Sequence, residues 1–303
     1  MRPIPAYKTG LCGLTETRQL SNSNSKSPFI PVHRTGHSGC LSKACTTSAD
    51  RGLEEKQNHC SLHPRSQNKA FWVRGKDRAR ICVPIVETHV KKAIEAIEEA
   101  NSLADLIELR ADYLKEPKLA VLMKNRKKPF IITNRRIEEG GRYRGDGKER
   151  FEILKEAVEL GAEYVDVEIR SRRSLLQDLI ANKSKTKMIL SFHDSQRTPS
   201  QKELRGLYDH MSRLGADVVK IVTFAASWED NLQVLSLIPF ARKKKQEIVT
   251  FCMGEKGKLS RIFAPLMGAA WTYASSRRDK TSAPGQLTVG EMIEVWEKLT
   301  VQG

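Results

Sequence analysis

The sequence predicts a (β/α)8 barrel, or TIM barrel, over residues 79–303, after an extension of residues 1–78 that we expect to be disordered. From residue 80 onward, eight apolar runs that resemble strands alternate with stretches in which apolar residues recur every three or four positions. Strands that alternate with helices form parallel sheets, and eight such pairs in about 220 residues are typical of this barrel. A doubly wound open sheet is the alternative, but no glycine-rich turn follows the first run.

Each predicted strand is a short run rich in Ile, Val, Leu and Phe, as strands buried on both faces of a parallel sheet are. The eight runs occupy residues 80–86, 104–110, 129–135, 164–169, 187–192, 217–222, 247–252 and 269–275. The clearest helical periods between them lie at residues 89–100, 148–160, 200–214 and 228–244. We interpret residues 79–303 as one domain.

Residues 1–78 differ from the rest, with little hydrophobic periodicity and many Ser, Asn, Thr and Pro. Such a segment buries too little apolar surface to offset the entropy lost on ordering. Its first 49 residues hold a single acid, Glu16, as organelle transit peptides do, but no arginine-rich amphipathic helix supports that interpretation. We therefore expect a disordered, basic extension without a signal peptide.

The charge of the chain is concentrated in this extension. The formal net charge is +16, and residues 1–78 contribute +8 of it, from 13 Lys and Arg against 5 Asp and Glu. A nucleic-acid-binding protein is therefore an alternative, but the extension lacks interleaved aromatic residues and any known reader fold. We expect no nucleic-acid partner, and no membrane partner, because no run of about 18 apolar residues is present.

The cysteines indicate a reducing compartment. Cys82 and Cys252 lie singly inside predicted strands, as reduced core residues of cytosolic proteins do, so we expect a cytoplasmic protein. The extension also holds four side chains of the kind that bind zinc: Cys40, Cys45, Cys60 and His63. Their spacings match no usual zinc motif, so we expect no metal site.

Polar side chains mark the carboxyl ends of the predicted strands, where barrels of this kind gather their active sites. The candidates are Glu108, Arg110, Arg135, Glu139, His193, Lys220, Arg261, Ser282 and Gln286. Structural explanations exist for several of them. Glu108 and Arg110 could pair on one strand face, Arg135 could be a solvated strand end, and His193 could be part of a capping pair.

Lys220 has the weakest structural explanation, because it interrupts the apolar run VVKIV. Burying an unpaired ammonium costs several kcal/mol. A desolvated lysine near other cations is driven toward the neutral amine, and lowering its pKa from about 10.4 to about 7–8 costs roughly 4 kcal/mol. The neutral amine condenses with a ketone, and the resulting iminium makes a neighbouring C–H acidic.

Other candidates complete this chemistry. His193 is of the right type to move the proton, and Glu139 to orient its ring. Arg110, Arg135 and Arg261 supply positive charge for an anionic substrate such as a carboxylate. The residues alone predict a Schiff-base lyase or aldolase that acts on a small keto acid.

Six motifs in register between residues 80 and 303 resemble those of type I 3-dehydroquinate dehydratase, an enzyme of the shikimate pathway and of aromatic amino acid biosynthesis. They are ELRAD at 108–112, TNRRIEEGG at 133–141, SFHD at 191–194, DVVKI at 217–221, SRIFAPLMGAAWTYA at 260–274 and SAPGQ at 282–286. Each motif is weak by itself, but six in the same order are specific.

By this resemblance, Lys220 forms an imine with the C3 ketone of 3-dehydroquinate. His193, positioned by Glu139, removes a proton from C2 and protonates the departing C1 hydroxyl, so that syn elimination of water gives 3-dehydroshikimate. The substrate ligands would be Glu108, Arg110, Arg135, Arg261, Ser282 and Gln286, with Arg261 as the partner of the carboxylate. The resemblance implies a homodimer. It also implies no metal or cofactor, because Lys220 supplies the electron sink.

Two points remain open in the sequence. Pro84 stands where many members of the family have a serine that contacts the substrate, which puts that contact in doubt. Another class I Schiff-base aldolase or lyase on the same barrel is the alternative activity. Sugar-phosphate aldolases need a phosphate-binding loop, and SAPGQ is a poor candidate for one.

Overall fold

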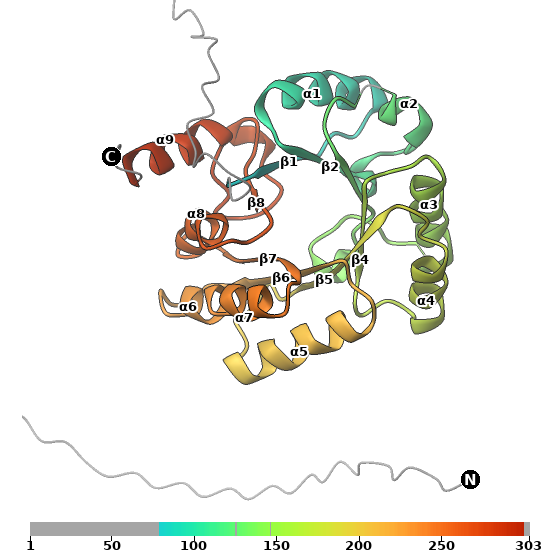
Figure 1. Cartoon of the computed structure of the whole chain (residues 1–303). Helices are drawn as coiled ribbons and strands as arrows, with labels where there is room; N and C mark the ends of the chain where they lie inside the picture. Colours follow the sequence, from blue (N-terminus) through green and yellow to red (C-terminus); the bar gives the residue numbers. More distant parts are fainter. Residues whose placement is uncertain (1–78, 125, 146, 300–303) are drawn as a thin grey trace, which may run out of the picture. The chain divides into compact units, whose positions relative to one another are not determined.

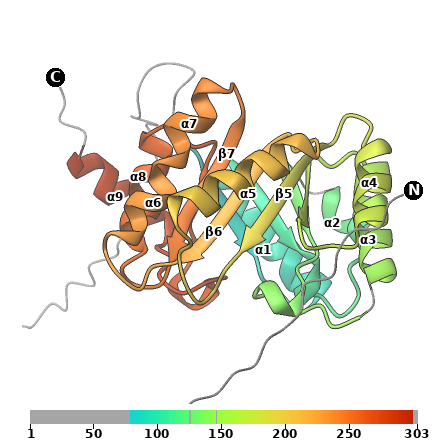
Figure 2. The same cartoon turned by 90° about the horizontal axis from the view of Figure 1, so that it is seen from below.

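The computed structural model describes residues 79–299, except for residues 125 and 146. Eight parallel strands form one sheet in the order β7-β6-β5-β4-β3-β2-β1-β8. Their bounds are β1 (Ile81–Ile85), β2 (Leu106–Arg110), β3 (Phe130–Thr133), β4 (Tyr164–Glu168), β5 (Lys187–His193), β6 (Val218–Phe224), β7 (Glu247–Met253) and β8 (Thr272–Tyr273). Figure 1 shows the strands around a common centre with the helices outside, and Figure 2 shows the same arrangement from below. The predicted (β/α)8 barrel is confirmed.

Helices follow the strands along the whole described chain. They are α1 (Val90–Leu103), α2 (Leu119–Met123), α3 (Gly147–Glu159), α4 (Arg173–Ala181), α5 (Gln201–Arg213), α6 (Asp230–Leu235), α7 (Leu237–Lys243), α8 (Lys258–Leu266) and α9 (Val289–Leu299), with short 3-10 turns η1 (Ala111–Tyr113), η2 (Ile137–Glu139) and η3 (Arg278–Lys280). The single helix predicted at residues 228–244 is wrong, because α6 and α7 meet at Ser236. Pro239 in the first turn of α7 has no N–H to donate to the carbonyl of Leu235, which favours the break between the two helices.

Side chains alternate along each strand, and the inward ones form layers to which every second strand contributes. The lower layer is apolar and consists of Leu106 of β2, Tyr164 of β4, Val218 of β6 and Trp271 just before β8. Two residues further along the same strands lies a layer of Glu108, Asp166, Lys220 and Tyr273, which we call the polar layer. Because barrel interiors are normally filled by bulky aliphatic residues, the polar layer is the clearest departure from a purely structural core.

The last strand is short for a reason that the sequence contains. β8 has two residues, and beyond it the Ala274 N–H donates to the Cys82 carbonyl of β1 at 3.1 Å. The next bond of this ladder would come from the N–H of residue 84, which is Pro84 and has none. Pro84 therefore ends the ladder, and most of the run predicted at residues 269–275 lies outside β8.

The barrel closes between β7 and β8. Here the Ala270 N–H donates to the Ile248 carbonyl of β7 at 2.8 Å, and α8 packs against both strands. This bond lies at the amino-terminal side of β8, and no described residues of β7 and β8 form a ladder. The loops that follow these two strands border the site.

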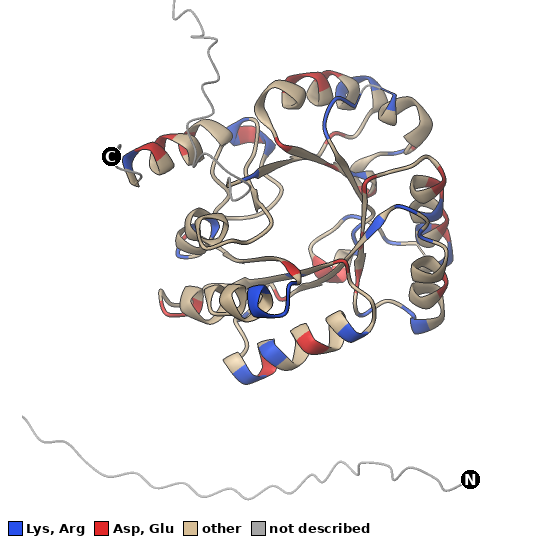
Figure 3. Cartoon of the chain, viewed as in Figure 1, with Lys and Arg blue, Asp and Glu red and all other residues tan. Residues whose placement is uncertain are grey.

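The outer core lies between the strands and the helices, where most of the buried aliphatic residues cluster. Figure 3 shows that acidic and basic residues alternate along α5. Cys82 and Cys252 are buried and free, which confirms the two reduced core cysteines. No helix of the described residues is both long and apolar enough to cross a membrane. The disorder expected of residues 1–78 and the zinc ligand set considered there lie outside the described residues.

Candidate active site

The ammonium group of Lys220 lies at the centre of the polar layer. Its Nζ atom is 2.8 Å from Asp166 Oδ2, 3.0 Å from the Tyr273 hydroxyl and 3.3 Å from Glu108 Oε1. The Lys220 side chain is 5% exposed. Three N–H donors therefore meet three acceptors, which explains how a lysine can be buried in the middle of an apolar strand.

These partners correct one sequence-based expectation. The argument for a reactive Lys220 invoked neighbouring cations, but its nearest charged partners are the carboxylates of Asp166 and Glu108. Although burial raises the pKa of Asp166, the charges of Arg135 and Lys220 outweigh it and lower that pKa far below its usual range. Asp166 therefore favours its charged form, and its contact with Nζ holds Lys220 in place.

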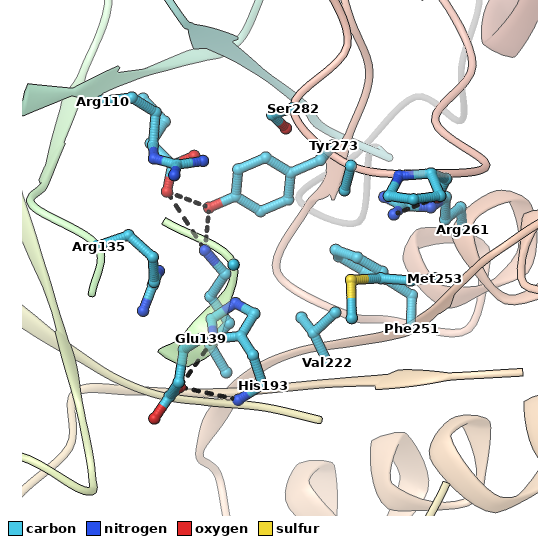
Figure 4. A pocket seen from close by; sticks show the side chains of 15 residues that line it. Arg110, Arg135, Glu139, His193, Val222, Phe251, Met253, Arg261, Tyr273 and Ser282 are labelled. Carbon is cyan, nitrogen blue, oxygen red and sulfur yellow. Dashed lines mark hydrogen bonds and ion pairs between the residues drawn. The ribbon is translucent and has the colours of Figure 1, made fainter. Parts of the chain in front are cut away.

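His193 and Glu139 form a second pair at the rim of the barrel. Glu139 follows β3 in the turn η2, and its Oε2 atom is 3.2 Å from His193 Nδ1 and accepts the His193 backbone N–H at 3.0 Å. Figure 4 shows the two side chains joined by dashed lines. The expected orienting contact is therefore present. It fixes the ring so that Nε2 is left for chemistry.

Burial sets the proton affinity of both members of this pair. It raises the pKa of Glu139 to about 7, with the neighbouring Glu168 adding to the rise. It lowers the pKa of His193 well below its ordinary value, and the cations Arg135 and Lys220 lower it further. The imidazole is consequently neutral near pH 7 and able to accept a proton.

Two of the three candidate arginines are already paired. Arg110 makes a bidentate contact with Asp112 at 2.8 and 2.7 Å. Arg135 contacts Asp166 at 2.7 Å and Glu168 at 3.3 Å. Their charges are largely neutralised inside the protein, so they offer N–H donors to a ligand but little net charge.

Arg261 is different, because it is a buried cation that makes no ion pair with any described residue. Its side chain comes from α8 and is 1% exposed. Burial lowers its pKa to about 10. The one hydrogen bond of its side chain to a described residue is a long contact of 3.5 Å with the Pro284 carbonyl, and its Nε–H is unsatisfied. A buried guanidinium of this kind is poised to bind an anion that enters the site.

A loop after η3 carries the remaining two candidates. Ser282 borders the cavity, whereas Gln286 does not. The Gln286 Oε1 atom accepts the Ser282 backbone N–H at 2.7 Å and its hydroxyl at 3.2 Å. Gln286 therefore shapes the loop in this structure rather than facing the cavity.

Most of the predicted site residues surround one cavity of about 130 Å³ at the carboxyl ends of the strands. The predicted residues at its wall are Glu108, Arg110, Arg135, Glu139, His193, Lys220, Arg261 and Ser282. In Figure 4 Arg135 and Arg261 lie on opposite sides of this cavity. Pro84 does not line the cavity. The position at which many family members have a substrate-contacting serine therefore contributes no side chain to the cavity wall.

Sequence reasoning missed several members of the site. Asp166 and Tyr273 belong to the polar layer, and Phe251 and Met253 line the cavity. A signal for Asp166 was present, since it lies two residues after Tyr164 in an apolar strand, as Lys220 lies two residues after Val218. Tyr273 gave no such signal, because an aromatic residue in a strand is ordinary core.

Known proteins resemble this chain along the whole barrel. The family model of type I 3-dehydroquinase matches residues 81–302. A 3-dehydroquinate dehydratase of Methanocaldococcus jannaschii is 38% identical over 226 residues, which cover 73% of this chain and 100% of that protein. A bifunctional chloroplastic 3-dehydroquinate dehydratase/shikimate dehydrogenase of Arabidopsis thaliana is 34% identical over 73% of this chain and 37% of its own length.

Solved structures agree. The 3-dehydroquinate dehydratase of Geobacillus kaustophilus superposes with a TM-score of 0.68 at 26% identity and covers 73% of this chain and 91% of its own. The type I 3-dehydroquinate dehydratase of Clostridium difficile, solved with covalently modified comenic acid, superposes with a TM-score of 0.67 at 27% identity and covers 73% of this chain and 92% of its own.

Proposed function

Because the chain belongs to the type I 3-dehydroquinase family, we propose that Lys220, His193 and Glu139 carry out its reaction through an imine intermediate. The activity itself is that of a 3-dehydroquinate dehydratase, a hydro-lyase of the shikimate pathway and of aromatic amino acid biosynthesis. The observation that carries the proposal is Lys220 at the floor of a cavity whose wall also holds the His193–Glu139 pair and the unpaired Arg261.

Arg261 binds the carboxylate of 3-dehydroquinate. It is the cavity cation without an acidic partner among the described residues. A carboxylate would neutralise its charge and accept hydrogen bonds from its unsatisfied N–H groups. Glu108, Arg110, Arg135 and Ser282 then face the hydroxyl groups of the ring. Gln286 acts through Ser282, whose backbone N–H and hydroxyl it holds.

The elimination proceeds from the imine. The Lys220 amine adds to the C3 ketone and water leaves, which gives an iminium that draws electrons from C2. His193 takes the C2 proton, and the electron pair of that C–H bond moves toward the iminium nitrogen. The electron pair then returns, the C1–O bond breaks, and His193 gives its proton to the leaving oxygen. Hydrolysis of the product iminium releases 3-dehydroshikimate and Lys220, so the lysine takes the part of an electron-sink cofactor.

The alternative of another class I Schiff-base aldolase or lyase is not favoured. The family match spans residues 81–302, and the relatives at 34–38% identity are dehydratases in name. The homodimer and the cytoplasmic location stay predictions. Size-exclusion chromatography with light scattering tests the first, and localisation of a tagged full-length chain tests the second.

The test of the mechanism is borohydride reduction in the presence of substrate or product. We expect reduction to leave the ligand covalently attached, with the mass increase confined to the peptide that contains Lys220. Turnover is followed separately by the ultraviolet absorbance of the conjugated product after 3-dehydroquinate is added. A dehydratase that turns over without labelling of Lys220 would rule out the imine but leave the activity in place.

The variant Lys220→Met tests the role of the Lys220 amine while the other site residues are kept. It should abolish both trapping and turnover, because the amine is gone. The structure adds that it should also destabilise the barrel, since Glu108 loses a buried partner and Asp166 keeps only Arg135 and Ser191. Removing one partner of a buried ion pair costs about 3–5 kcal/mol. Lys298→Met, on the exposed face of α9, is the control and should change neither activity nor the melting temperature.

A further inference from the structure

Tyr273 is a member of the polar layer to which the mechanism above gives no part. Its side chain ends β8 and is 4% exposed, and its hydroxyl is 3.0 Å from Lys220 Nζ and 3.5 Å from Glu108 Oε1. Figure 4 shows this hydroxyl at the centre of the cavity, with dashed lines to its two partners. The ring is held by Phe251, whose centroid is 5.9 Å away. The phenol is thus fixed against the atom that forms the imine.

Imine formation requires the movement of two protons from nitrogen to oxygen. The Lys220 ammonium carries three hydrogens, the iminium carries one, and the other two leave with the ketone oxygen as water. The carboxylates beside Nζ can accept a proton, but as anions they have none to give. Three described side chains lie within hydrogen-bond distance of Lys220 Nζ, and two of them are carboxylates. The third is Tyr273, whose hydroxyl can both donate and accept a proton.

The two carboxylates are not equivalent as acceptors. Asp166 also binds Arg135 at 2.7 Å and the Ser191 hydroxyl at 2.6 Å, and those contacts hold it as an anion. Glu108 binds the Thr133 hydroxyl at 2.8 Å and has no arginine within ion-pair distance among the described residues. Glu108 is therefore the better temporary proton acceptor, and it is also the one that contacts Tyr273.

We propose that Tyr273 is a catalytic residue that relays a proton from Glu108 to the oxygen that leaves during imine formation, and in reverse during imine hydrolysis. This inference rests on the proposed imine at Lys220. First the ammonium gives one proton to Glu108, and the amine then adds to the ketone. One of the two protons on the added nitrogen passes to the former carbonyl oxygen, which gives a carbinolamine.

The carbinolamine then loses water. Its C–O bond breaks as the Tyr273 hydroxyl donates a proton to the departing oxygen and takes the stored proton from Glu108. Both protons lost by nitrogen end in the water molecule, and Glu108 and Tyr273 return to their starting states. Burial raises the pKa of Tyr273 well above its ordinary value, which is consistent with a phenol that gives a proton only as it receives one.

Tyr273→Phe tests the relay, because it removes one hydroxyl and keeps the ring that packs on Phe251. The full-length chain is mixed with 3-dehydroquinate, quenched with borohydride at short times, and the labelled fraction of Lys220 is measured by mass spectrometry. We expect the rate of labelling to fall about 100-fold, the lower end of the usual effect of a positioned acid–base group. Tyr164→Phe, one layer below in the same barrel, is the matched control and should label at the unmodified rate.

A kinetic isotope effect distinguishes a proton relay by Tyr273 from a purely structural role of its hydroxyl. With substrate deuterated at C2, slow imine formation hides the proton-removal step, so the isotope effect on kcat should fall to one in Tyr273→Phe. A purely structural loss would slow proton removal as well and leave the isotope effect in place, which overturns the relay. Labelling of Tyr273→Phe at the unmodified rate overturns it too. Failure to label Lys220 in the unmodified protein would instead reject the imine itself.

Discussion

A single charged side chain in an apolar strand is the feature of this protein that local physics explains best. The cost of burying Lys220 is offset by its three N–H groups, which meet two carboxylates and a phenol. The residue pattern predicted an unusual lysine, but it did not identify its partners, because they come from strands 53 to 112 residues away. Contacts at such separations follow from the barrel, not from sequence spacing.

Arg261→Ala should raise KM strongly and leave labelling of Lys220 by saturating substrate possible. Loss of a charge-assisted contact to a buried carboxylate costs roughly 2–4 kcal/mol, which corresponds to about 30- to 900-fold in KM. Lys244→Ala, on the outer surface at 45% side-chain exposure, is the comparison. Steady-state kinetics on both variants decides, and an unchanged KM in Arg261→Ala would remove this residue from the carboxylate site.

The acid–base pair makes stability depend on pH. Because the folded-state pKa of Glu139 is about 7 and its ordinary value is 4.5, its contribution to stability is present below pH 4.5 and is lost as the pH rises through 7. Glu139→Gln removes this titration, so its melting temperature relative to the unmodified protein should rise by several degrees between pH 5 and pH 8. Glu138→Gln, at an exposed neighbouring position, should show no such trend.

At the scale of elements, the strands were predictable and the breaks between elements were less so. The eight strands follow from runs of apolar residues, and each predicted run overlaps an observed strand. The break at Ser236 needed the geometry of Pro239, and the short β8 needed the position of Pro84 opposite its ladder. The shift of Gln286 out of the cavity wall was not predictable, because it depends on how the loop folds onto Ser282.

The loop after β8 is positioned by a close backbone approach. Gly285 has φ +74°, and a Cβ atom there would lie 2.1 Å from the Gly254 carbonyl oxygen of the loop after β7. The neighbouring Pro284 carbonyl accepts the Gly254 N–H at 3.1 Å and lies 3.5 Å from an Arg261 nitrogen. A side chain at residue 285 should therefore push this support away from the guanidinium.

Gly285→Ala should accordingly raise KM at least about 10-fold with a smaller change in kcat, because binding is disturbed more than the lysine chemistry. Gly206→Ala in α5 is the matched control, since a Cβ there meets no atom within 4 Å. That control should keep KM and raise helix stability by up to about 1 kcal/mol. Equal kinetics for the two variants would show that the loop adapts without consequence for substrate binding.

On the scale of the whole molecule, the barrel accounts for every group that the proposed reaction uses. All nine predicted site residues lie within the described part, between Glu108 and Gln286. The domain boundary near residue 79 stays a prediction, which rests on the hydrophobic periodicity that begins near residue 80. For residues 1–78, whose composition has no periodic apolar face, the sequence predicts disorder, and that prediction lies outside the described residues.

Deletion of residues 1–78 should leave folding and kcat/KM essentially unchanged. The first strand starts at Ile81, and its partners Leu106 and Thr272 are in the part that remains. Thermal unfolding and steady-state kinetics of the full-length and shortened chains provide the comparison. Loss of a cooperative transition in the shortened chain would show that the extension supports the barrel.

The two-residue strand β8 is attached to its neighbours by few backbone hydrogen bonds, and we expect this to determine how the enzyme loses activity on heating. Pro84 ends its ladder with β1, so few backbone bonds retain the segment that carries the phenol above Lys220. A weakly tethered strand detaches before the rest of the sheet. Heat inactivation should then begin as a local and reversible event that precedes the loss of helical circular dichroism, so that activity lost on brief heating returns on cooling.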